Sequence, residues 1–197
     1  MDQDVPLRIT LLAVLLVTMA IALYYRWRAA QGGDQITYAD EGYLFALGLR
    51  LVGFVAWVSI AGWLIYPPAF AWAALPLLEW LRWTGVAMAG LAPLLIYWTF
   101  SNLGRNLTDT VMTRAEAHLV TEGPYRWVRH PFYFTVAWVL LAITLASANG
   151  LIAVSGLSVL LLLALRTPKE EEMLVKRFGD EYRTYMAETG QYFPRLW

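Results

Sequence analysis

Five long apolar runs constrain the fold of this chain more than any other feature. They cover residues 7–25, 42–65, 80–100, 132–148 and 150–165. Hydrocarbon offers backbone groups no hydrogen-bond partner, so a run of about 20 apolar residues crosses a bilayer as a helix. Composition agrees, because 59% of the residues are apolar and only 15% are charged, against roughly a quarter charged in soluble domains. The sequence predicts an all-α integral membrane protein with about five transmembrane helices.

The ends of these runs and the segments between them lead to further predictions. The first run has acids at Asp2 and Asp4 and continues directly into "YYRWR", so we interpret it as a retained anchor and not as a signal peptide. The segment 67–80 contains three prolines and is expected to lie along the membrane interface. The last two runs are short and joined by "SANG", which predicts a tight helical hairpin followed by a helical tail. We expect a single domain over residues 1–197, without repeats or linkers.

Lysine and arginine residues predict the orientation of the chain. They gather in the segment 101–131 and in the tail after residue 165, and Arg26 and Arg28 follow the first run. By the positive-inside rule these segments are cytoplasmic. With five spans, the amino terminus lies outside and the carboxyl terminus inside. This topology and the small size favour a prokaryotic inner membrane.

Several classes of site are disfavoured by composition. The chain has no cysteine, which excludes disulfides and thiolate chemistry. Two histidines far apart in the sequence give no metal site, and a formal net charge of zero argues against nucleic acid as a partner.

Two charged segments flank the final hairpin. The basic loop (residues 118–131) ends in "RWVRHP", with Pro131 suited to the first turn of the next helix. By themselves Arg126, Arg129 and His130 would be interpreted as anchors at the membrane surface. After the hairpin, Thr167 and Glu170 have the spacing of a capping box, which predicts that a new helix begins at Thr167 and that Glu170 folds back onto it.

The acidic turn (residues 170–172) has two faces. Residues three and four apart share a helix face, so Glu170 and Glu171 lie with the apolar residues 173–175 and 178, whereas Glu172 faces Lys176 and solvent. Inward carboxylates need a cation, which could be Arg126, Arg129 and Arg166 or a positively charged ligand. Gly179 is expected to end this helix, and Asp180 to cap a second one.

These segments carry a family resemblance. "HLVTEGPYRWVRHPFY" (118–133), followed by "RTPKEEEMLVKRFGDEYRTYM" (166–186), resembles the isoprenylcysteine carboxyl methyltransferase family, which is related to the membrane phospholipid methyltransferases. The resemblance implies a transferase that uses S-adenosylmethionine on the cytoplasmic side. Residues 101–197 would form the cofactor-binding part, and residues 1–100 the acceptor side. The implied cofactor-binding residues are His118, Leu119, Val120, Tyr125, Arg129, His130, Pro131 and Glu170. His118 departs from the pattern, which expects a histidine at position 117.

The chemistry of a sulfonium donor suits this assignment. Methyl transfer is an in-line displacement in which the protein aligns the reactants and excludes water. Glu170 or Glu171 would face the donor's ammonium group, and Arg129 with His130 its carboxylate. The implied acceptor is lipidic or prenylcysteine-like. Arg166 would position a carboxylate acceptor, whereas an amine or thiol would need Glu171 or His130 to accept a proton.

Two other functional classes remain alternatives. A membrane sterol-type reductase that uses NADPH has a related carboxyl half, but three glutamates suit its extra phosphate poorly. In a non-catalytic scaffold or transporter the charges would only anchor the helices, although a transporter would more typically show repeats. Arg50, near the centre of the second run, marks either a functional site or a structural contact. Asn102, Arg105 and Asn106 could contact the donor or the acceptor or only finish the third span, and we favour the second interpretation.

Overall fold

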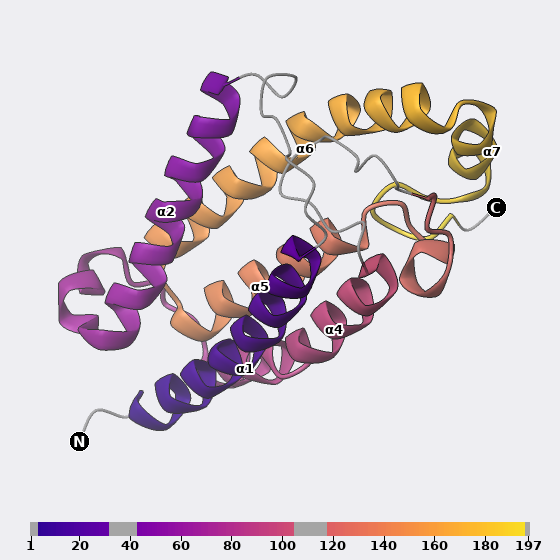
Figure 1. Ribbon diagram of the computed structural model, residues 1–197. Coiled ribbons are helices and arrows are strands. Elements are labelled where there is room, and N and C mark those ends of the chain that lie inside the picture. The colour runs from indigo at the N-terminus through magenta and orange to yellow at the C-terminus, as the bar shows by residue number, and fades with distance from the viewer. Residues whose placement is uncertain (1–3, 32–42, 105–117, 196–197) are drawn as a thin grey trace.

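The regular secondary structure of the described residues is helical. The computed structural model describes residues 4–31, 43–104 and 118–195 (Figure 1). The helices are α1 (Val5–Ala30), α2 (Tyr43–Ile65), α3 (Glu79–Ala89), α4 (Ala92–Leu103), α5 (Pro131–Ser147), α6 (Gly150–Phe178) and α7 (Asp180–Glu188), with 3-10 helices η1 (Pro67–Ala73) and η3 (Gly123–Arg126). Apart from two isolated β-bridges, this part of the chain contains no strand. The predicted all-α class is confirmed.

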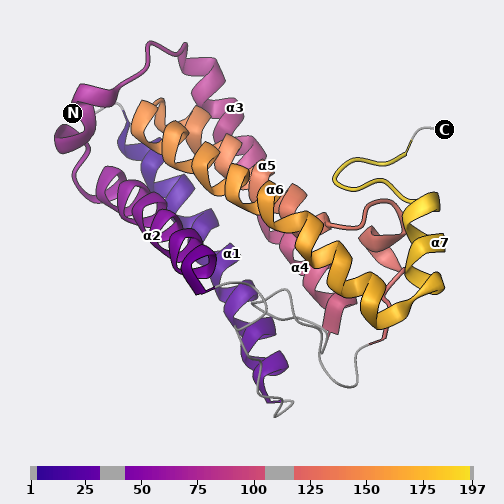
Figure 2. The same ribbon diagram turned by 90° about the horizontal axis from the view of Figure 1, so that it is seen from above.

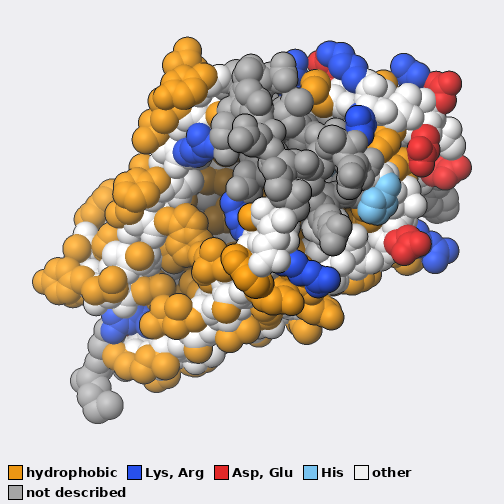
Figure 3. Space-filling model, viewed as in Figure 1, with side chains coloured by type: hydrophobic (Ala, Val, Ile, Leu, Met, Phe, Trp, Pro, Cys, Tyr) orange, Lys and Arg blue, Asp and Glu red, His pale blue; other side chains and the backbone are white. Residues whose placement is uncertain are grey.

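Long apolar helices make this a multi-pass membrane protein. Four helical segments are long and apolar enough to cross a bilayer: α1, α2, the combined segment Glu79–Leu103, and α6. Helix α5 is also apolar but has only 17 residues. The helices pack side by side, α2 against α6, α1 against α4, and α3 against α5 (Figures 1 and 2). Charged side chains gather toward the end that carries α7, and apolar side chains dominate the rest of the visible face (Figure 3). Five spans remain a prediction, because α5 is short.

The predicted hairpin of α5 and α6 is present and is held by its turn. Ala148 adopts the left-handed conformation, with φ 47° and ψ 48°. The side-chain oxygen of Asn149 accepts hydrogen bonds from the backbone N–H groups of Leu151 at 3.1 Å and Ile152 at 3.3 Å, so Asn149 caps α6. Its amide also donates to the carbonyl of Phe70 at 2.9 Å. The turn therefore fixes both the hairpin and η1.

The third apolar run is one segment with a break. The run predicted over 80–100 becomes α3 and α4, which meet at Gly90 and Leu91. Pro93 stands in the first turn of α4, and because proline has no N–H it interrupts the helical ladder. The N–H groups of Leu94 and Leu95 both bond to the carbonyl of Leu91, at 3.1 and 3.0 Å.

The predicted capping box at Thr167 is wrong. Helix α6 continues through this position to Phe178, with Pro168 inside it. Thr167 is fully buried and its hydroxyl donates to the carbonyl of Leu163, one turn earlier, at 2.9 Å. Burial against the tail overrides the local capping signal. Glu170 therefore does not fold back onto Thr167, and lies one turn beyond Arg166 on the same continuous helix.

The predicted break at Gly179 is confirmed. This glycine has φ 60° and ψ −128°, and its N–H bonds to the carbonyl of Val175 at 2.8 Å. Positive φ favours glycine because it lacks a Cβ. Helix α7 begins at Asp180, so Gly179 and not Asp180 holds the N-cap position. The carboxylate of Asp180 accepts instead from Arg183 at 2.6 Å, so the predicted cap is wrong.

Helices α3 and α5 cross in close contact at Gly85. A Cβ atom added there would meet the backbone nitrogen of Ala146 at 2.5 Å and the carbonyl oxygen of Ala142 at 2.6 Å. Small residues at helix interfaces in membranes allow such close approach. The crossing carries the core cluster of Val86, Ala89, Ala142, Ile143 and Ala146, together with residues of α1, α2 and α6.

We expect Gly85→Ala to destabilise the fold by about 1–3 kcal/mol, because the added methyl group would force α3 and α5 apart. Thermal unfolding in detergent measures the effect as a lower Tm. Gly53→Ala is the matched control, since a Cβ at Gly53 meets no atom within 4 Å. Equal melting temperatures for the two variants would contradict the tight crossing.

Candidate functional site

The basic loop and the carboxyl-terminal tail are joined by their backbones. The N–H of Arg129 bonds to the carbonyl of Gly190 at 2.9 Å, and the N–H of His130 to that of Gln191 at 3.0 Å. Val128 and Gly190 form an isolated parallel bridge. The tail that follows α7 thus returns to lie beside the basic loop (Figure 2).

Side chains from the loop and from α6 form a buried ion network, which consists of Arg129, His130, Arg166, Glu170 and Glu171. Arg129 Nε lies 2.8 Å from Glu171 Oε1, and His130 Nε2 lies 3.2 Å from the same oxygen. Arg166 Nε lies 3.0 Å from Glu170 Oε1. These side chains are only 8–16% exposed. The two charged segments predicted to fold together do so.

Further hydrogen bonds connect the network to α7, to the start of the tail that follows it, and to Tyr133. Arg129 also donates to the carbonyls of Met186, at 3.1 Å, and of Thr189. The hydroxyl of Tyr133 donates to Glu170 Oε1 at 2.7 Å. The ring of Tyr133 stacks on that of His130, with centroids 5.3 Å apart and planes at 9°. One tyrosine therefore positions both a carboxylate and an imidazole.

The acidic turn has two inward carboxylates and one exposed carboxylate, as predicted. Glu170 and Glu171 point inward to cations, whereas Glu172 is exposed and pairs with Lys176 at 2.6 Å. Of the three arginines proposed as partners, Arg129 and Arg166 take part. Arg126 is exposed, and its guanidinium lies 5.9 Å from the centre of the Trp127 ring.

Glu171 is strongly held in its ionised form. It lies in the charged extension of α6, beyond the apolar segment 150–165. Burial alone would raise its pKa, but hydrogen bonds and charges from His130 and Arg129 outweigh this and lower the pKa from 4.5 to about 2. A carboxylate with this pKa is a weak base at neutral pH. The geometry favours Glu171 as a positioning group for Arg129 and His130.

The other predicted site residues occupy several environments. Tyr125 is buried, its carbonyl accepts a hydrogen bond from the hydroxyl of Tyr185 at 2.5 Å, and burial raises the pKa of its phenol. Pro131 is the first residue of α5, as predicted. Leu119 and Val120 are half-buried and His118 is exposed, in a non-helical stretch before η3. None of these last three side chains belongs to the ion network as defined above.

Gly123 shows why the basic loop lies close to α4. It has φ 58°, and a Cβ placed there would lie 2.4 Å from the side-chain oxygen of Asn102. Asn102 itself donates to the carbonyl of Trp98 at 2.7 Å, which agrees with its expected role at the end of the third span. Arg105 and Asn106 lie outside the described residues. Arg50 is exposed on α2 and has no part in the ion network.

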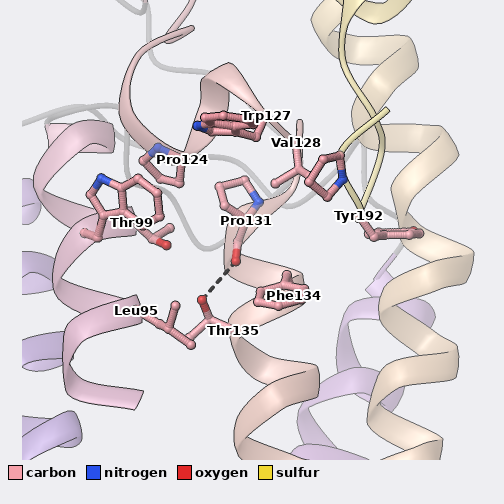
Figure 4. Close-up of a pocket in the computed structure, with 11 residues that line it drawn as sticks. Leu95, Thr99, Pro124, Trp127, Val128, Pro131, Phe134, Thr135 and Tyr192 are labelled. Carbon is pink, nitrogen blue, oxygen red and sulfur yellow. Dashed lines mark hydrogen bonds between the residues drawn. The ribbon is translucent and has the colours of Figure 1, made fainter. Parts of the chain in front are cut away.

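An apolar pocket adjoins the ion network. Its volume is about 250 Å³, and α4, η3, the start of α5 and the tail enclose it (Figure 4). Its walls are formed by Leu95, Trp98, Thr99, Pro124, Trp127, Val128, Pro131, Phe134, Thr135, Tyr192 and Pro194. Val128 and Pro131 flank the residues of the basic loop that enter the network.

Two contributors to the site were not predicted as such. Tyr133 stands inside the quoted motif, three positions after His130, so the i,i+3 rule could have placed it beside that histidine. Tyr192 carries no such signal. Its hydroxyl donates to Thr167 Oγ1 at 2.6 Å, and it reaches α6 only through the folded tail.

Comparison with known proteins agrees with this architecture. Residues 85–176 match the isoprenylcysteine carboxyl methyltransferase (ICMT) family. The structure of the eukaryotic intramembrane Ras methyltransferase ICMT aligns with 95% of this chain and 68% of its own, with a TM-score of 0.59 and 21% identity. The chain therefore has the fold of that all-helical membrane class.

Sequence relatives are consistent with the family match. The chain is 34% identical over 119 residues to protein-S-isoprenylcysteine O-methyltransferase of Homo sapiens. This alignment covers 58% of the chain and 41% of the human protein. The chain is also 34% identical over 79 residues to methanethiol S-methyltransferase of Mycobacterium tuberculosis, covering 40% and 30%. The chain thus spans about two fifths of the human protein's length. These matches make residues 85–176 similar to the isoprenylcysteine carboxyl methyltransferase family.

We expect Glu171→Gln to lower the Tm in detergent at neutral pH, because it leaves the buried Arg129 without a full counter-charge. The folded-state pKa of Glu171 is lowered from 4.5 to about 2, so its ionised form stabilises the fold above pH 4.5 and this contribution is lost as the pH falls toward 2. The difference in Tm between wild type and variant should shrink over that range. Glu172→Gln, at the exposed neighbour, should change little; a pH-independent difference for Glu171→Gln would contradict the assignment.

Proposed function

We propose that the protein is an S-adenosylmethionine-dependent methyltransferase that acts at the cytoplasmic membrane surface on a lipidic or prenylcysteine-like acceptor. The observation that carries the proposal is the buried ion network between the basic loop and the acidic turn. All five of its side chains lie within the region that matches the methyltransferase family. A structural anchor would need neither two inward carboxylates nor their convergence on one histidine.

The residues around the network fit a polar ligand. Tyr182, on α7, is 1% exposed, and within the described part of the chain its hydroxyl has no hydrogen-bond partner. Burial raises the pKa of this phenol, and the charges of Glu171 and Arg129 also act on it. A buried hydroxyl without a partner costs free energy, and a bound polar group beside Arg129 and Glu171 would satisfy it.

Donor binding would use both signs of charge. S-adenosylmethionine supplies a methyl group on a sulfonium. Glu170 suits its ammonium group, while Arg129 and His130 suit its carboxylate, and Tyr125 with the half-buried Leu119 and Val120 offers an apolar surface for the base. The role of these residues is to orient the donor and exclude water, which is the main requirement of an in-line displacement.

The nature of the acceptor decides which proton steps are needed. A carboxylate acceptor is already nucleophilic at neutral pH, and Arg166 would only position it, so carboxyl O-methylation makes the smallest demand on the site. Similarity to a methanethiol S-methyltransferase favours a thiol as the second candidate. A thiol must lose a proton. With the pKa of Glu171 at about 2, His130 is then the better acceptor of that proton.

The proposed orientation puts the site where both substrates can reach it. The charged end of the molecule (Figure 3) would face the cytoplasm, as the distribution of arginine and lysine predicts. A soluble donor would enter from water, and a lipidic acceptor from the bilayer. The amino terminus would then lie outside, in a prokaryotic inner membrane.

Donor binding tests the assignment directly. Tritiated S-adenosylmethionine should bind the purified protein and be displaced by S-adenosylhomocysteine but not by NADPH, which would separate a methyltransferase from a reductase or a scaffold. Glu170→Gln and His130→Ala should weaken binding roughly tenfold to a hundredfold, the range for a lost charged hydrogen bond. Glu172→Gln is the matched control. Unchanged affinity in both site variants would reduce these residues to structural roles.

The acceptor side is separable from the donor side. Arg166→Ala should preserve donor affinity within a few-fold, because Tyr133 still donates to Glu170. It should lower kcat/KM for a carboxylate acceptor roughly tenfold or more, measured as methyl incorporation. An equal loss of donor affinity would assign Arg166 to the donor instead.

A further inference from the structure

The helix ends opposite the ion network are joined by side-chain contacts. Arg82, in the first turn of α3, donates to both carboxylate oxygens of Asp4 at the start of α1, at 2.7 and 2.9 Å. Its Nε donates to the carbonyl of Ala146 at the end of α5, at 3.2 Å. Arg8 donates to the carbonyl of Leu64 at the end of α2, at 3.3 Å. These five residues define the far boundary of the molecule.

The helices have similar lengths between this far boundary and the first charged, amide or imidazole side chain on the network side. The stretches contain 15 to 19 residues, over 9–25, 51–65, 83–101, 131–147 and 150–165. At a rise of 1.5 Å per residue they extend roughly 23–29 Å along the helix axes. Tilt from the membrane normal shortens the distance that they span. The five lengths agree with one another, and all are below the roughly 30 Å of a typical hydrocarbon core.

Exposed aromatic rings mark the same two levels. Trp80 and Trp83 are exposed at the start of α3, beside the far boundary. At the other end of this segment, Tyr97 and Trp98 are exposed on α4. The ring centre of Tyr97 lies 6.1 Å from that of Tyr25, so α1 reaches the same level there. Tryptophan and tyrosine favour the membrane–water interface, and the rise from Trp83 to Tyr97 is only about 21 Å.

The surface between the two levels suits lipid acyl chains. On α6 the residues that are 61–65% exposed are Val154, Leu157, Leu161 and Leu165, which follow the three- and four-residue spacing of one helix face. Lys169 continues this stripe one turn later, with its side chain 44% exposed. The apolar stripe therefore ends where the charged end of the molecule begins (Figure 3).

We propose that these helices are matched to a bilayer with a hydrocarbon core about 25 Å thick, thinner than the typical core of about 30 Å. In a thicker bilayer either the far boundary or the network side would enter hydrocarbon, where charged groups are costly. Helix α5, with 17 residues, has the length that the thinner core requires and crosses it as the fifth span. The proposal does not depend on the methyltransferase function.

The thin core also accounts for the position of Arg50. Along α2 this residue lies about 21 Å from Leu64 at the far boundary. Arg50 is therefore at the opposite edge of the core and not at its centre, although it stands in the middle of an apolar run. An arginine at that level can extend its guanidinium group toward the lipid head groups. The apolar residues before it, Leu44 and Leu47, then lie outside the hydrocarbon core.

Reconstitution in bilayers of graded thickness tests the match. The lipids are dimyristoleoyl-, dipalmitoleoyl-, dioleoyl-, dieicosenoyl- and dierucoyl-phosphatidylcholine, which differ only in acyl chain length. The Tm should be highest in the dipalmitoleoyl or dioleoyl lipid. It should be about 5 °C lower in the dierucoyl lipid, because mismatch costs free energy for every ångström. A maximum in the dieicosenoyl or dierucoyl lipid, or a Tm that does not change along the series, would overturn the proposal.

Single cysteines measure depth directly, because the chain has no cysteine of its own. N-ethylmaleimide crosses bilayers but reacts with the thiolate, which hydrocarbon disfavours. In dioleoyl-phosphatidylcholine, Leu16→Cys, Leu141→Cys and Leu161→Cys should be protected. Leu44→Cys and Leu47→Cys should react at least about tenfold faster, since their thiols can ionise in water. All five positions are exposed, so burial inside the protein does not cause the difference.

Unfolding provides the control for this measurement. In sodium dodecyl sulfate all five cysteines should react at similar rates, which would show that the bilayer causes the protection. Protection of both Leu44→Cys and Leu47→Cys in the bilayer would put Arg50 inside the core and overturn the proposal. A reactive Leu141→Cys would mean that α5 does not cross, and would also overturn it. Neither measurement uses donor or acceptor, so the methyltransferase function stands or falls separately.

Discussion

The contact between Arg129 and Glu171 is the interaction on which the polar half of the molecule depends. It joins the loop before the final hairpin to the second helix of that hairpin, α6, at 2.8 Å and largely out of solvent. Removing one partner of such a pair leaves a buried charge and costs about 3–5 kcal/mol. Separation of the loop from α6 is therefore unfavourable. Arg129 also ties down the end of α7 and the tail through two carbonyls. The same contact therefore sets the position of His130, the course of the tail and the wall of the apolar pocket.

The depth of helix α6 in the membrane determines the position of this contact. Its first part is apolar and packs against α2 and α5, and its last part carries Arg166, Glu170 and Glu171. Because the helix is continuous through Pro168, the depth at which its apolar part sits also fixes the height of the carboxylates. A separate tail helix beginning at Thr167 would have left that height free to vary. Continuity thus favours a site at a defined level of the membrane boundary.

Much of this could be predicted from local sequence, and the failures have a common cause. Apolar run length predicted the main helices, and "SANG" predicted the hairpin. The i,i+3 and i,i+4 spacing predicted the inward carboxylates, and their need for a cation indicated Arg129 and Arg166, together with Arg126, which takes no part in the network. The capping box at Thr167 was wrong because the same local pattern is buried here, with Tyr192 bonded to its hydroxyl. Pro93 marks the break between α3 and α4 in the sequence. The run of apolar residues on both sides of it nevertheless led to the prediction of a single span. The contacts of Gly190, Gln191 and Tyr192 involve no periodic pattern, since they depend on how the tail returns after α7.

The division of the site between local and distant segments also separates its proposed tasks. Every side chain of the ion network lies within residues 85–176, the region that matches the family, whereas Tyr192 and Pro194 lie beyond it. Charge recognition by carboxylates and guanidiniums imposes strict geometry, because a displaced partner leaves an unpaired buried charge. An apolar pocket imposes less, since rings and aliphatic chains of similar volume can replace one another at small cost. Charge recognition is therefore confined to the region that matches the family, and the tail beyond it contributes apolar walls and the hydroxyl of Tyr192.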